Sequence, residues 1–520
     1  MTPLRRALLA AGVPALGAAT LLLYATTAGV GVTPDSVIYL DAARHLAAGD
    51  GYVAVRMGMA APQPLIHYPP LYPFALSTAA RAGVAPLDAA RWFNVFLFAG
   101  NVVLIGALIF RTCASVPAVF LGAFLAALSV PFIESHSAVW SEPLFLFCFL
   151  LGIWLVALGR SGAVWVALGS VAIGFAWLTR YAAGALLPGF IVGRFLTARG
   201  VLRRRAAEAA LIAVLASLPI GLWSLRNIAL IGAPADRGYR FRLLSGNDVI
   251  TFFRVASSWL FPGSERIALV PLQDGAIALA LAVVAAALVY VRLHSQPASM
   301  EHTARKATAW LLFACGCAYF IMLLVSKLFF DHSTPFDQRI LSPVFAVALV
   351  IVAAYLTSVW RSGGHAVHVV LGAFLVYAAV GYTAVAWVTV RYLHENGRGF
   401  NAKSWRYDRI FTRLAESDDG LWIYSNHPAA VFYLTGRQAS QVPVPGVRLG
   451  GQNPWGLSKS VDGPVLIVLF EDARKFAPRD ESARNPIRIE AEILRLIELR
   501  GGVVLERERN AVLYRVESFP

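Results

Sequence analysis

The feature that most constrains this chain is a series of long apolar stretches that fills its first 390 residues. Most of the stretches approach the roughly 17–25 residues that a helix needs to cross a bilayer. There are eleven, near residues 7–32, 92–110, 116–133, 143–159, 163–179, 182–198, 207–231, 275–293, 307–325, 341–359 and 366–389. The sequence therefore predicts a mainly α, polytopic membrane protein of about eleven transmembrane helices. The stretches 143–159 and 163–179 are short, so a re-entrant segment stays open for either.

The composition excludes other classes of protein. Hydrophobic residues make up 58% of the chain and charged residues 14%, against roughly 25% charged residues in soluble domains. An ordinary water-soluble enzyme is therefore excluded, and so is an intrinsically disordered chain, which has a low apolar fraction.

The charge is distributed unevenly along the chain. Residues 1–390 carry 26 Lys/Arg and 14 Asp/Glu, whereas residues 391–520 carry 19 and 16. The net charge of +15 thus comes mainly from the apolar part, and we expect no nucleic-acid partner. This change of composition predicts a transmembrane domain over 1–390 and a small α/β domain over 391–520.

The side of each loop follows from its charge. Arg5 and Arg6 precede a first apolar run of about 26 residues, which exceeds the roughly 7–15 of a signal-peptide core, so we expect an uncleaved first helix. Alternating the loops from a cytoplasmic N-terminus places thirteen basic residues and only two acids inside, which agrees with the positive-inside rule. Twelve of the fourteen acids of residues 1–390 then fall outside. We expect a protein of the cytoplasmic membrane with its C-terminal domain on the outer face.

The first outer loop, residues 33–91, is too apolar to be surrounded by solvent. We expect two short interfacial helices in it. Thr33-Pro34-Asp35 has an N-cap residue, a proline at the first helical position and an acid in the first turn, so the first of these helices should begin there. The segment Tyr68-Pro69-Pro70-Leu71-Tyr72-Pro73 predicts a stiff corner before the second helix.

Beyond Val390 the pattern is that of a small α/β domain. Leu421–Ser425 and Pro464–Phe470 are short apolar runs bounded by turn residues, which suits buried strands. Pro428–Leu434 and 487–500 are expected to be helical. Val503–Val516 is expected to form two strands around Arg509-Asn510.

Asp35 is the strongest candidate for a catalytic residue. An acid in a first helical turn is favoured by the helix dipole, which alone would explain it. Asp35 also opens a long loop directly after a membrane helix, where a carboxylate can face a lipid-borne substrate. Asp41 and His45 on the same predicted helix share that face or are simply solvated.

The second outer loop places two acids and an imidazole within nine residues, as Glu134, His136 and Glu142. Residues of these types can coordinate a divalent metal ion or orient a sugar. Two alternatives stay open: Glu142 caps the following helix, and any metal ligands come from distant loops.

Three arginines lie at the outer ends of predicted helices, namely Arg180, Arg226 and Arg339. Each could snorkel to lipid headgroups. A charge at helix depth costs about 2.5–3.5 kcal/mol, so each needs an interior partner or an anion. The planar guanidinium fork suits phosphate, and three of them on the acid-rich side favour a phosphate-bearing substrate.

Five segments resemble motifs of the GT-C glycosyltransferases by their order along the chain and by their predicted place on the outer face. Within that superfamily the chain is most similar to the branch of the protein O-mannosyltransferases and the lipid A aminoarabinose transferase. The five segments are Asp35-Ser36-Val37-Ile38-Tyr39, Tyr68-Pro69-Pro70-Leu71-Tyr72-Pro73, Leu178-Thr179-Arg180-Tyr181, Trp223-Ser224-Leu225-Arg226-Asn227 and Asp337-Gln338-Arg339-Ile340-Leu341-Ser342-Pro343. The resemblance spans roughly residues 1–390, and the outer C-terminal domain also fits it.

The resemblance implies an inverting transferase of the cell envelope, which moves a hexosyl or pentosyl group from a polyprenyl-phosphate carrier to a lipid, glycan or protein acceptor. The family's catalytic acid falls on Asp35, which would accept the proton of the acceptor hydroxyl. Arg180, Arg226 and Arg339 would stabilise the leaving phosphate. Several relatives carry paired acids in the first loop, whereas Ser36 follows Asp35 here, so a metal would need other ligands. Our candidates for substrate binding are Asp41, His67, Tyr68, Glu134, His136, Glu142 and Asp337, and Glu134, His136 and Glu142 are also the metal candidates.

A transporter or flippase of a phosphate-bearing lipid or glycan precursor is the main alternative. Transporters place ionisable residues near the bilayer midplane and often contain internal repeats. This sequence has few charges within its apolar stretches and no evident repeat, which favours the transferase.

Overall fold

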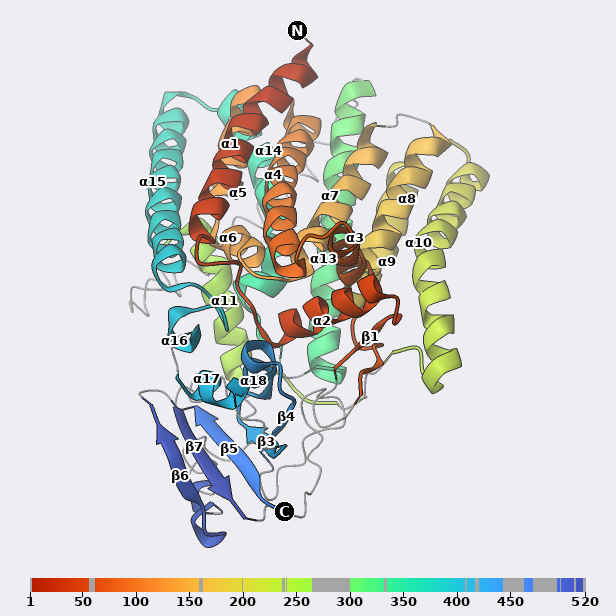
Figure 1. Ribbon diagram of the computed structural model, residues 1–520. Coiled ribbons are helices and arrows are strands. Elements are labelled where there is room, and N and C mark those ends of the chain that lie inside the picture. Colours follow the sequence, from red (N-terminus) through yellow and green to blue (C-terminus); the bar gives the residue numbers. More distant parts are fainter. Residues whose placement is uncertain are drawn as a thin grey trace.

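The structure is a computed structural model, and it describes residues 2–55, 61–158, 162–198, 200–235, 239, 241–263, 300–331, 334–406, 409–416, 420–442, 463–470, 493–495, 497–508 and 511–517. Most of the helices form one bundle, and a small sheet lies at one end of it (Figure 1). The N-terminus lies at the opposite end of the bundle from the sheet.

Six helices within the described ranges are long and apolar enough to cross a membrane. They are α1 (Pro3–Ala25), α4 (Pro86–Cys113), α10 (Leu202–Ile231), α13 (Met300–Phe329), α14 (Gln338–Ser362) and α15 (His365–Asn396). Three shorter apolar segments accompany them, namely α7 (Glu142–Leu158), α8 (Ala163–Trp177) and the 3-10 turn η1 (Tyr181–Ala185) with α9 (Leu186–Thr197). The prediction of a multi-pass, mainly helical membrane protein is confirmed. The count of eleven spans stays a prediction, and the stretch 275–293 lies outside the described residues.

One apolar stretch is broken rather than straight. Helices α5 (Val116–Ala127) and α6 (Val130–His136) meet at an angle of 54°, and together they are a seventh candidate span or a re-entrant loop. Pro131 occupies the first turn of α6, where its missing N–H costs nothing, so a new helix starts there. The chain then passes through a short connection and enters α7 at Glu142.

The first outer loop contains the two short helices that the sequence predicts, α2 (Pro34–Ala48) and α3 (Leu71–Arg81). A two-stranded ribbon of β1 (Val53–Ala54) and β2 (Gln63–Pro64) connects them. Thr33 is the N-cap residue of α2, Pro34 is at its start and Asp35 is in its first turn, as expected. Helix α2 lies at the end of the bundle that faces the sheet, next to α18 (Pro428–Thr435) (Figure 1), so the helix that carries Asp35 lies near the junction of the bundle and the C-terminal region.

Helix α11 (Gly246–Leu260) was missed by the sequence analysis. It begins at a reciprocal capping box of Ser245 and Asp248, a pattern that marks helix starts. Asp248 also forms an ion pair of 2.9 Å with the buried Lys327 of α13. This helix is fixed beside α14 by Gln338, which donates to Ser258 and accepts from Trp259.

The C-terminal region is a small mixed sheet with helices. Its strands are β3 (Trp422–Ser425), β4 (Ala439–Gln441), β5 (Val465–Phe470), β6 (Val503–Arg507) and β7 (Ala511–Val516), in the order β4-β3-β5-β7-β6. Strand β3 pairs in parallel with β4 and β5, and β7 pairs antiparallel with β5 and β6. The remaining helices are α16 (Lys403–Arg406), α17 (Arg409–Glu416) and α18 (Pro428–Thr435). The predicted strands and the helix at 428–434 are present, β4, α16 and α17 were missed, and the helix predicted at 487–500 lies partly outside the described residues.

The two faces of this sheet bury different residues because side chains alternate along each strand. Leu466 and Val468 of β5 pack with Phe411 of α17 and Val431 of α18. Val465 and Ile467 lie on the other face, against the helical residues Ile493 and Ile497. The sheet is therefore covered on both sides, which is typical of an α/β unit.

Candidate active site

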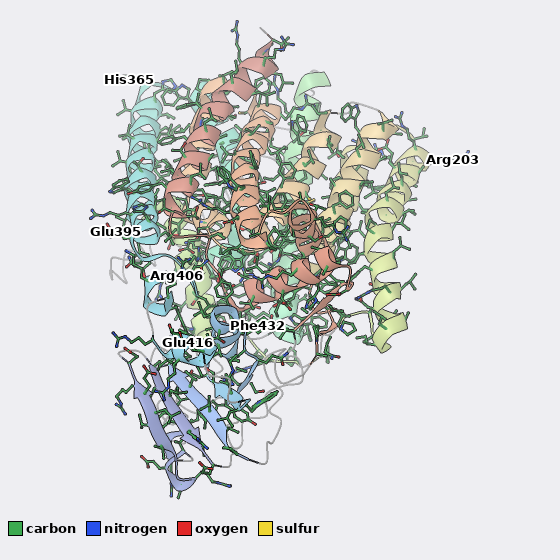
Figure 2. All side chains as sticks on the ribbon, in the orientation of Figure 1. Arg203, His365, Glu395, Arg406, Glu416 and Phe432 are labelled. Carbon is green, nitrogen blue, oxygen red and sulfur yellow. The ribbon has the colours of Figure 1, made fainter. Side chains whose placement is uncertain are left out.

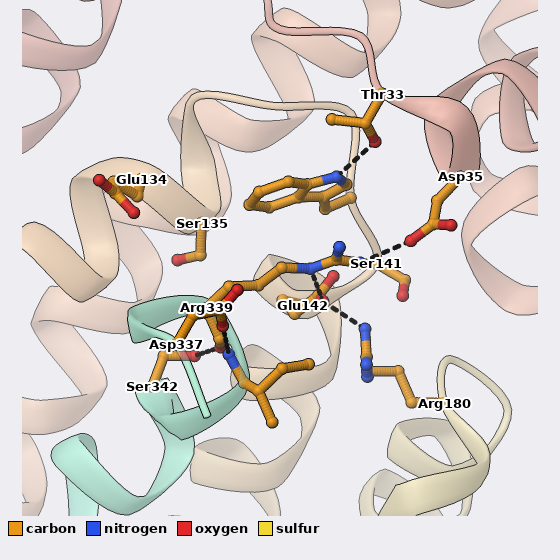
Figure 3. A network of polar contacts seen from close by, with 12 residues as sticks. Thr33, Asp35, Glu134, Ser135, Ser141, Glu142, Arg180, Asp337, Arg339 and Ser342 are labelled. Atoms are coloured by element: carbon orange, nitrogen blue, oxygen red, sulfur yellow. Dashed lines mark hydrogen bonds and ion pairs between the residues drawn. The ribbon is translucent and has the colours of Figure 1, made fainter. Parts of the chain in front are cut away.

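Asp35 lies at the start of α2, where two side chains from distant parts of the sequence hold its carboxylate. Figure 3 shows one of them, Arg339. The hydroxyl of Tyr68 donates to Oδ1 at 2.7 Å, and Nη2 of Arg339 donates to Oδ2 at 3.0 Å. The Asp35 side chain is still 33% exposed. It is thus fixed in orientation and reachable from outside the protein.

Glu142, in the first turn of α7, gathers two arginines. Arg180 and Arg339 both form ion pairs with its Oε1 atom, and the Glu142 side chain is only 3% exposed. Its Oε2 atom is buried without a hydrogen-bond partner among the described residues. A buried carboxylate is costly unless it is paired, so Glu142 depends on these two cations and in turn fixes their positions.

The two guanidinium groups keep donors for another anion. Each has five N–H bonds; Arg180 uses Nη1 on Glu142, and Arg339 uses Nε on Glu142 and Nη2 on Asp35. Their side chains are 19% and 17% exposed. A carboxylate and two partly exposed guanidinium groups therefore lie side by side, an arrangement that can hold a phosphate next to a general base.

Trp140 and Arg398 extend this cluster, and the sequence analysis assigned no role to either. The guanidinium carbon of Arg339 lies 4.0 Å from the centre of the Trp140 ring, and that of Arg398 lies 4.6 Å from it. The indole N–H of Trp140 donates to Oγ1 of Thr33 at 2.8 Å. Arg398 donates to the Glu134 carbonyl and to Ser137.

Three chain segments meet directly before Asp35. Gly31 forms a bridge with Ala138, and Val32 forms one with Gly399. The N–H of Phe400 donates to the Val32 carbonyl at 2.7 Å. The connection between α1 and α2, the loop before α7 and the turn after α15 are thereby fixed to one another, which places residues from all three near the candidate base.

The electrostatics keep Asp35 ionised. Burial opposes its charge, but Arg339, the Tyr68 hydroxyl and Arg180 outweigh burial and hold its pKa below the ordinary 3.8. Asp337, the N-cap residue of α14, behaves differently: burial raises its pKa, although the Ile340 N–H and Arg339 oppose the rise. Asp35 is therefore the anionic acceptor for a proton in this cluster.

Arg226, predicted to bind the donor phosphate, and Asp41, predicted to bind substrate, both hold the first outer loop in place. Arg226 of α10 donates to the carbonyls of Tyr52 and Leu65, at 3.2 Å each, and its guanidinium lies 4.6 Å from the Trp223 ring. Asp41 accepts the backbone N–H of Val55 at 2.7 Å. The structure does not bring Arg226 or Asp41 into contact with the Asp35 carboxylate.

The residues proposed as metal ligands do not come together. Nδ1 of His136 donates to the Phe132 carbonyl at 2.7 Å, and Nε2 accepts from Asn101 at 3.1 Å, so both ring nitrogens are occupied. Among the described residues, no group of three or more His, Cys, Asp or Glu side chains could hold a metal ion. Glu134 and Glu142 take part in the cluster differently, the first through its backbone carbonyl and the second through its two arginines. His67 packs edge-on against Tyr68, with ring centres 4.7 Å apart.

Comparison with solved structures shows which fold this is. No family model matches the sequence, and no curated protein matches it. The structure of ArnT from Cupriavidus metallidurans bound to undecaprenyl phosphate matches with a TM-score of 0.51 at 15% identity, over 97% of this chain and 97% of that one. The structure of the arabinofuranosyltransferase AftD from Mycobacteria matches with a TM-score of 0.52 at 15% identity, over 98% of this chain and 40% of that one. At this identity the likeness shows the fold, and the predicted resemblance to the GT-C membrane glycosyltransferases is confirmed at that level.

Proposed function

We propose that this membrane protein of GT-C fold is an inverting glycosyltransferase that moves a sugar from a polyprenyl-phosphate carrier to an acceptor hydroxyl. The observation that carries the proposal is the Asp35–Arg339–Glu142–Arg180 cluster, in which a reachable carboxylate lies beside two guanidinium groups. The undecaprenyl phosphate bound to the ArnT structure supports a polyprenyl-phosphate donor.

The chemistry follows from the places of these groups. Asp35 takes the proton of the acceptor hydroxyl while the oxygen of that hydroxyl forms a bond to the anomeric carbon of the donor sugar. The bond from that carbon to the phosphate oxygen breaks, and the electron pair leaves with the polyprenyl phosphate. Arg180 and Arg339 stabilise the charge that develops on the phosphate. Tyr68 keeps Asp35 turned toward the reacting hydroxyl through its hydrogen bond to Oδ1.

The proposed sidedness places this cluster outside the cytoplasmic membrane. Arg203 lies at the same end of the bundle as the N-terminus, and Arg406 and Glu416 lie toward the opposite end (Figure 2). The positive-inside rule then assigns the Arg203 end to the cytoplasm. We place a catalytic domain over 1–390 and an outer α/β domain over 391–520, with a lipid, glycan or protein as acceptor.

Mass spectrometry of lipid-linked sugars tests this function in cells that lack the protein. We expect a polyprenyl-phosphate sugar to accumulate, and we expect Asp35→Asn to leave it accumulated. Asp50→Asn is the matched control, because Asp50 belongs to the same loop but is 55% exposed and pairs with His45; this variant should clear the intermediate. A well-folded Asp35→Asn protein that clears it would refute Asp35 as the base, and absence of any accumulated carrier would refute the donor class.

A further inference from the structure

Trp140 contacts Arg339 and the residue at the start of the helix that carries Asp35. Its indole ring lies under the guanidinium of Arg339, 4.0 Å from the ring centre. Its N–H donates to Thr33, the N-cap residue of the helix that carries Asp35. Trp140 is only 6% exposed, so the ring has little freedom to move away from either contact.

The position of Trp140 is itself fixed by the backbone. The preceding N–H, of Val139, donates to the Gly31 carbonyl at 2.9 Å, and Gly31 in turn donates to the Ser137 carbonyl at 2.8 Å. Arg398 places a second guanidinium 4.6 Å from the ring centre. Because Arg398 is also bound to the Glu134 carbonyl and to Ser137, it clamps the loop that carries Trp140.

Thr33 allows the contact through the indole N–H to be tested apart from the contact between the ring face and Arg339. Its side chain makes no capping hydrogen bond in α2; instead Oγ1 accepts from Trp140 and lies 3.0 Å from Ser36 Oγ. Replacing the hydroxyl by a methyl group of similar size would thus remove the contacts of Thr33 with the indole N–H and with Ser36, whereas no side-chain capping hydrogen bond to the α2 backbone would be lost.

We propose that Trp140 is a positioning residue that sets Arg339 and Asp35 relative to each other, acting through its ring face on the first and through Thr33 on the second. This proposal rests on the proposed glycosyltransferase function and adds to it a residue that orients the phosphate-binding arginine. A cation over an aromatic face is attracted by the ring quadrupole, most strongly over tryptophan, so the indole holds Arg339 in one orientation.

Loss of the ring should change the ionisation of Asp35 as well as the rate. The groups that face Asp35 are Arg339 of α14, Arg180 after α8, Tyr68 before α3 and Tyr39 of its own helix. When Arg339 is no longer held against it, the carboxylate loses its nearest positive charge, and the pKa of Asp35 rises. The acidic limb of the kcat/KM profile should therefore move to higher pH.

The test compares four variants of the full chain in lipid nanodiscs: Trp140→Leu, Trp140→Phe, Thr33→Val and the control Trp92→Leu, whose side chain is 49% exposed on α4. Trp140→Leu should lower kcat on the order of 10–100-fold, the size of effect that misplacement by about 1 Å can cause, and should raise the pH of the acidic limb. Trp140→Phe keeps a ring face and should recover part of the rate. Trp92→Leu should match the wild type.

Each outcome bears on one of the two proposals. A folded Trp140→Leu protein with the kcat and pH profile of the wild type would overturn the positioning role. If that variant does not fold, Trp140→Phe and Thr33→Val decide, and wild-type profiles for both would overturn it. An inactive wild type, or an active Asp35→Asn, would instead overturn the glycosyltransferase function on which the inference rests.

Discussion

Glu142 gives the sharpest test of how the cluster is held together. It is a buried carboxylate that pairs with two guanidinium groups through one oxygen. Replacing it with Gln keeps the shape of the side chain and removes the charge. The amide can still accept a hydrogen bond, but Arg180 and Arg339 lose the anion between them. Within the described part of the chain, Arg339 keeps an ion pair with Asp35 and Arg180 keeps none.

The size of the effect follows from burial. Removing one partner of a buried ion pair costs about 3–5 kcal/mol, because the remaining charge is left without compensation. The two arginine side chains are 19% and 17% exposed, so water compensates part of the loss, and we expect about 3 kcal/mol for Glu142→Gln. Removing one of the stranded cations should recover stability, so Glu142→Gln with Arg180→Gln should be more stable than the sum of the two single variants by about 1–3 kcal/mol.

Equilibrium unfolding in mixed micelles, by titration with a denaturing detergent, measures these differences. Glu395→Gln is the control, because Glu395 forms an exposed pair with Arg391 on α15, and such pairs contribute little; it should leave the midpoint unchanged. Strict additivity of Glu142→Gln and Arg180→Gln, or a Glu142→Gln midpoint equal to that of the wild type, would refute the idea that Glu142 holds the two arginines in place.

Three further predictions concern pH, backbone and loop. Protonation of Asp35 should make kcat/KM fall only below pH 3.8, because the pKa of Asp35 is lowered. The same fall in kcat should lie at higher pH, because a bound donor phosphate adds negative charge beside Asp35. The same pH for both falls would contradict this. Gly399→Ala should destabilise the fold more than Gly436→Ala in the same unfolding assay. Both residues have positive φ, but a Cβ at Gly399 would clash with the Val32 carbonyl oxygen, whereas one at Gly436 meets nothing within 4 Å; equal losses would contradict this. Arg226→Ala should speed hydrogen exchange in the loop between α2 and α3, measured by mass spectrometry, and unchanged exchange would show that Arg226 does not fasten the loop.

The parts of the structure that the sequence predicts are those with local causes. The start of α2 follows from Thr33, Pro34 and Asp35, whose chain positions suffice to define a helix N-terminus. The spanning helices follow from their apolar length alone. The strands β3 and β5 follow from short apolar runs between turn residues.

Tertiary contacts decide the rest, and they join residues far apart in the chain. Arg226 and Arg339 look alike in sequence, each at the end of an apolar stretch, yet one meets backbone carbonyls and the other two carboxylates. The bridge from Val32 to Gly399 spans most of the chain, and no local pattern marks it. Trp140 lies in the second outer loop, where only the two acids and the histidine were candidate site residues. An aromatic residue at a membrane boundary is ordinarily explained as an interface anchor, so Trp140 was not predicted.

Charge balance explains why the cluster takes this form. Asp35 and Glu142 offset Arg180 and Arg339, so a site at the end of a membrane bundle avoids uncompensated charge while it is empty. On the proposed function, an incoming donor phosphate would compete with Asp35 for Arg339, because both are anions that bind the same fork of N–H donors. Donor binding would then weaken the ion pair with Arg339, which contributes to the lowered pKa of Asp35, while Glu142, buried and bound to both arginines, would hold them in place. The same arginine can thus link arrival of the donor to activation of the acceptor.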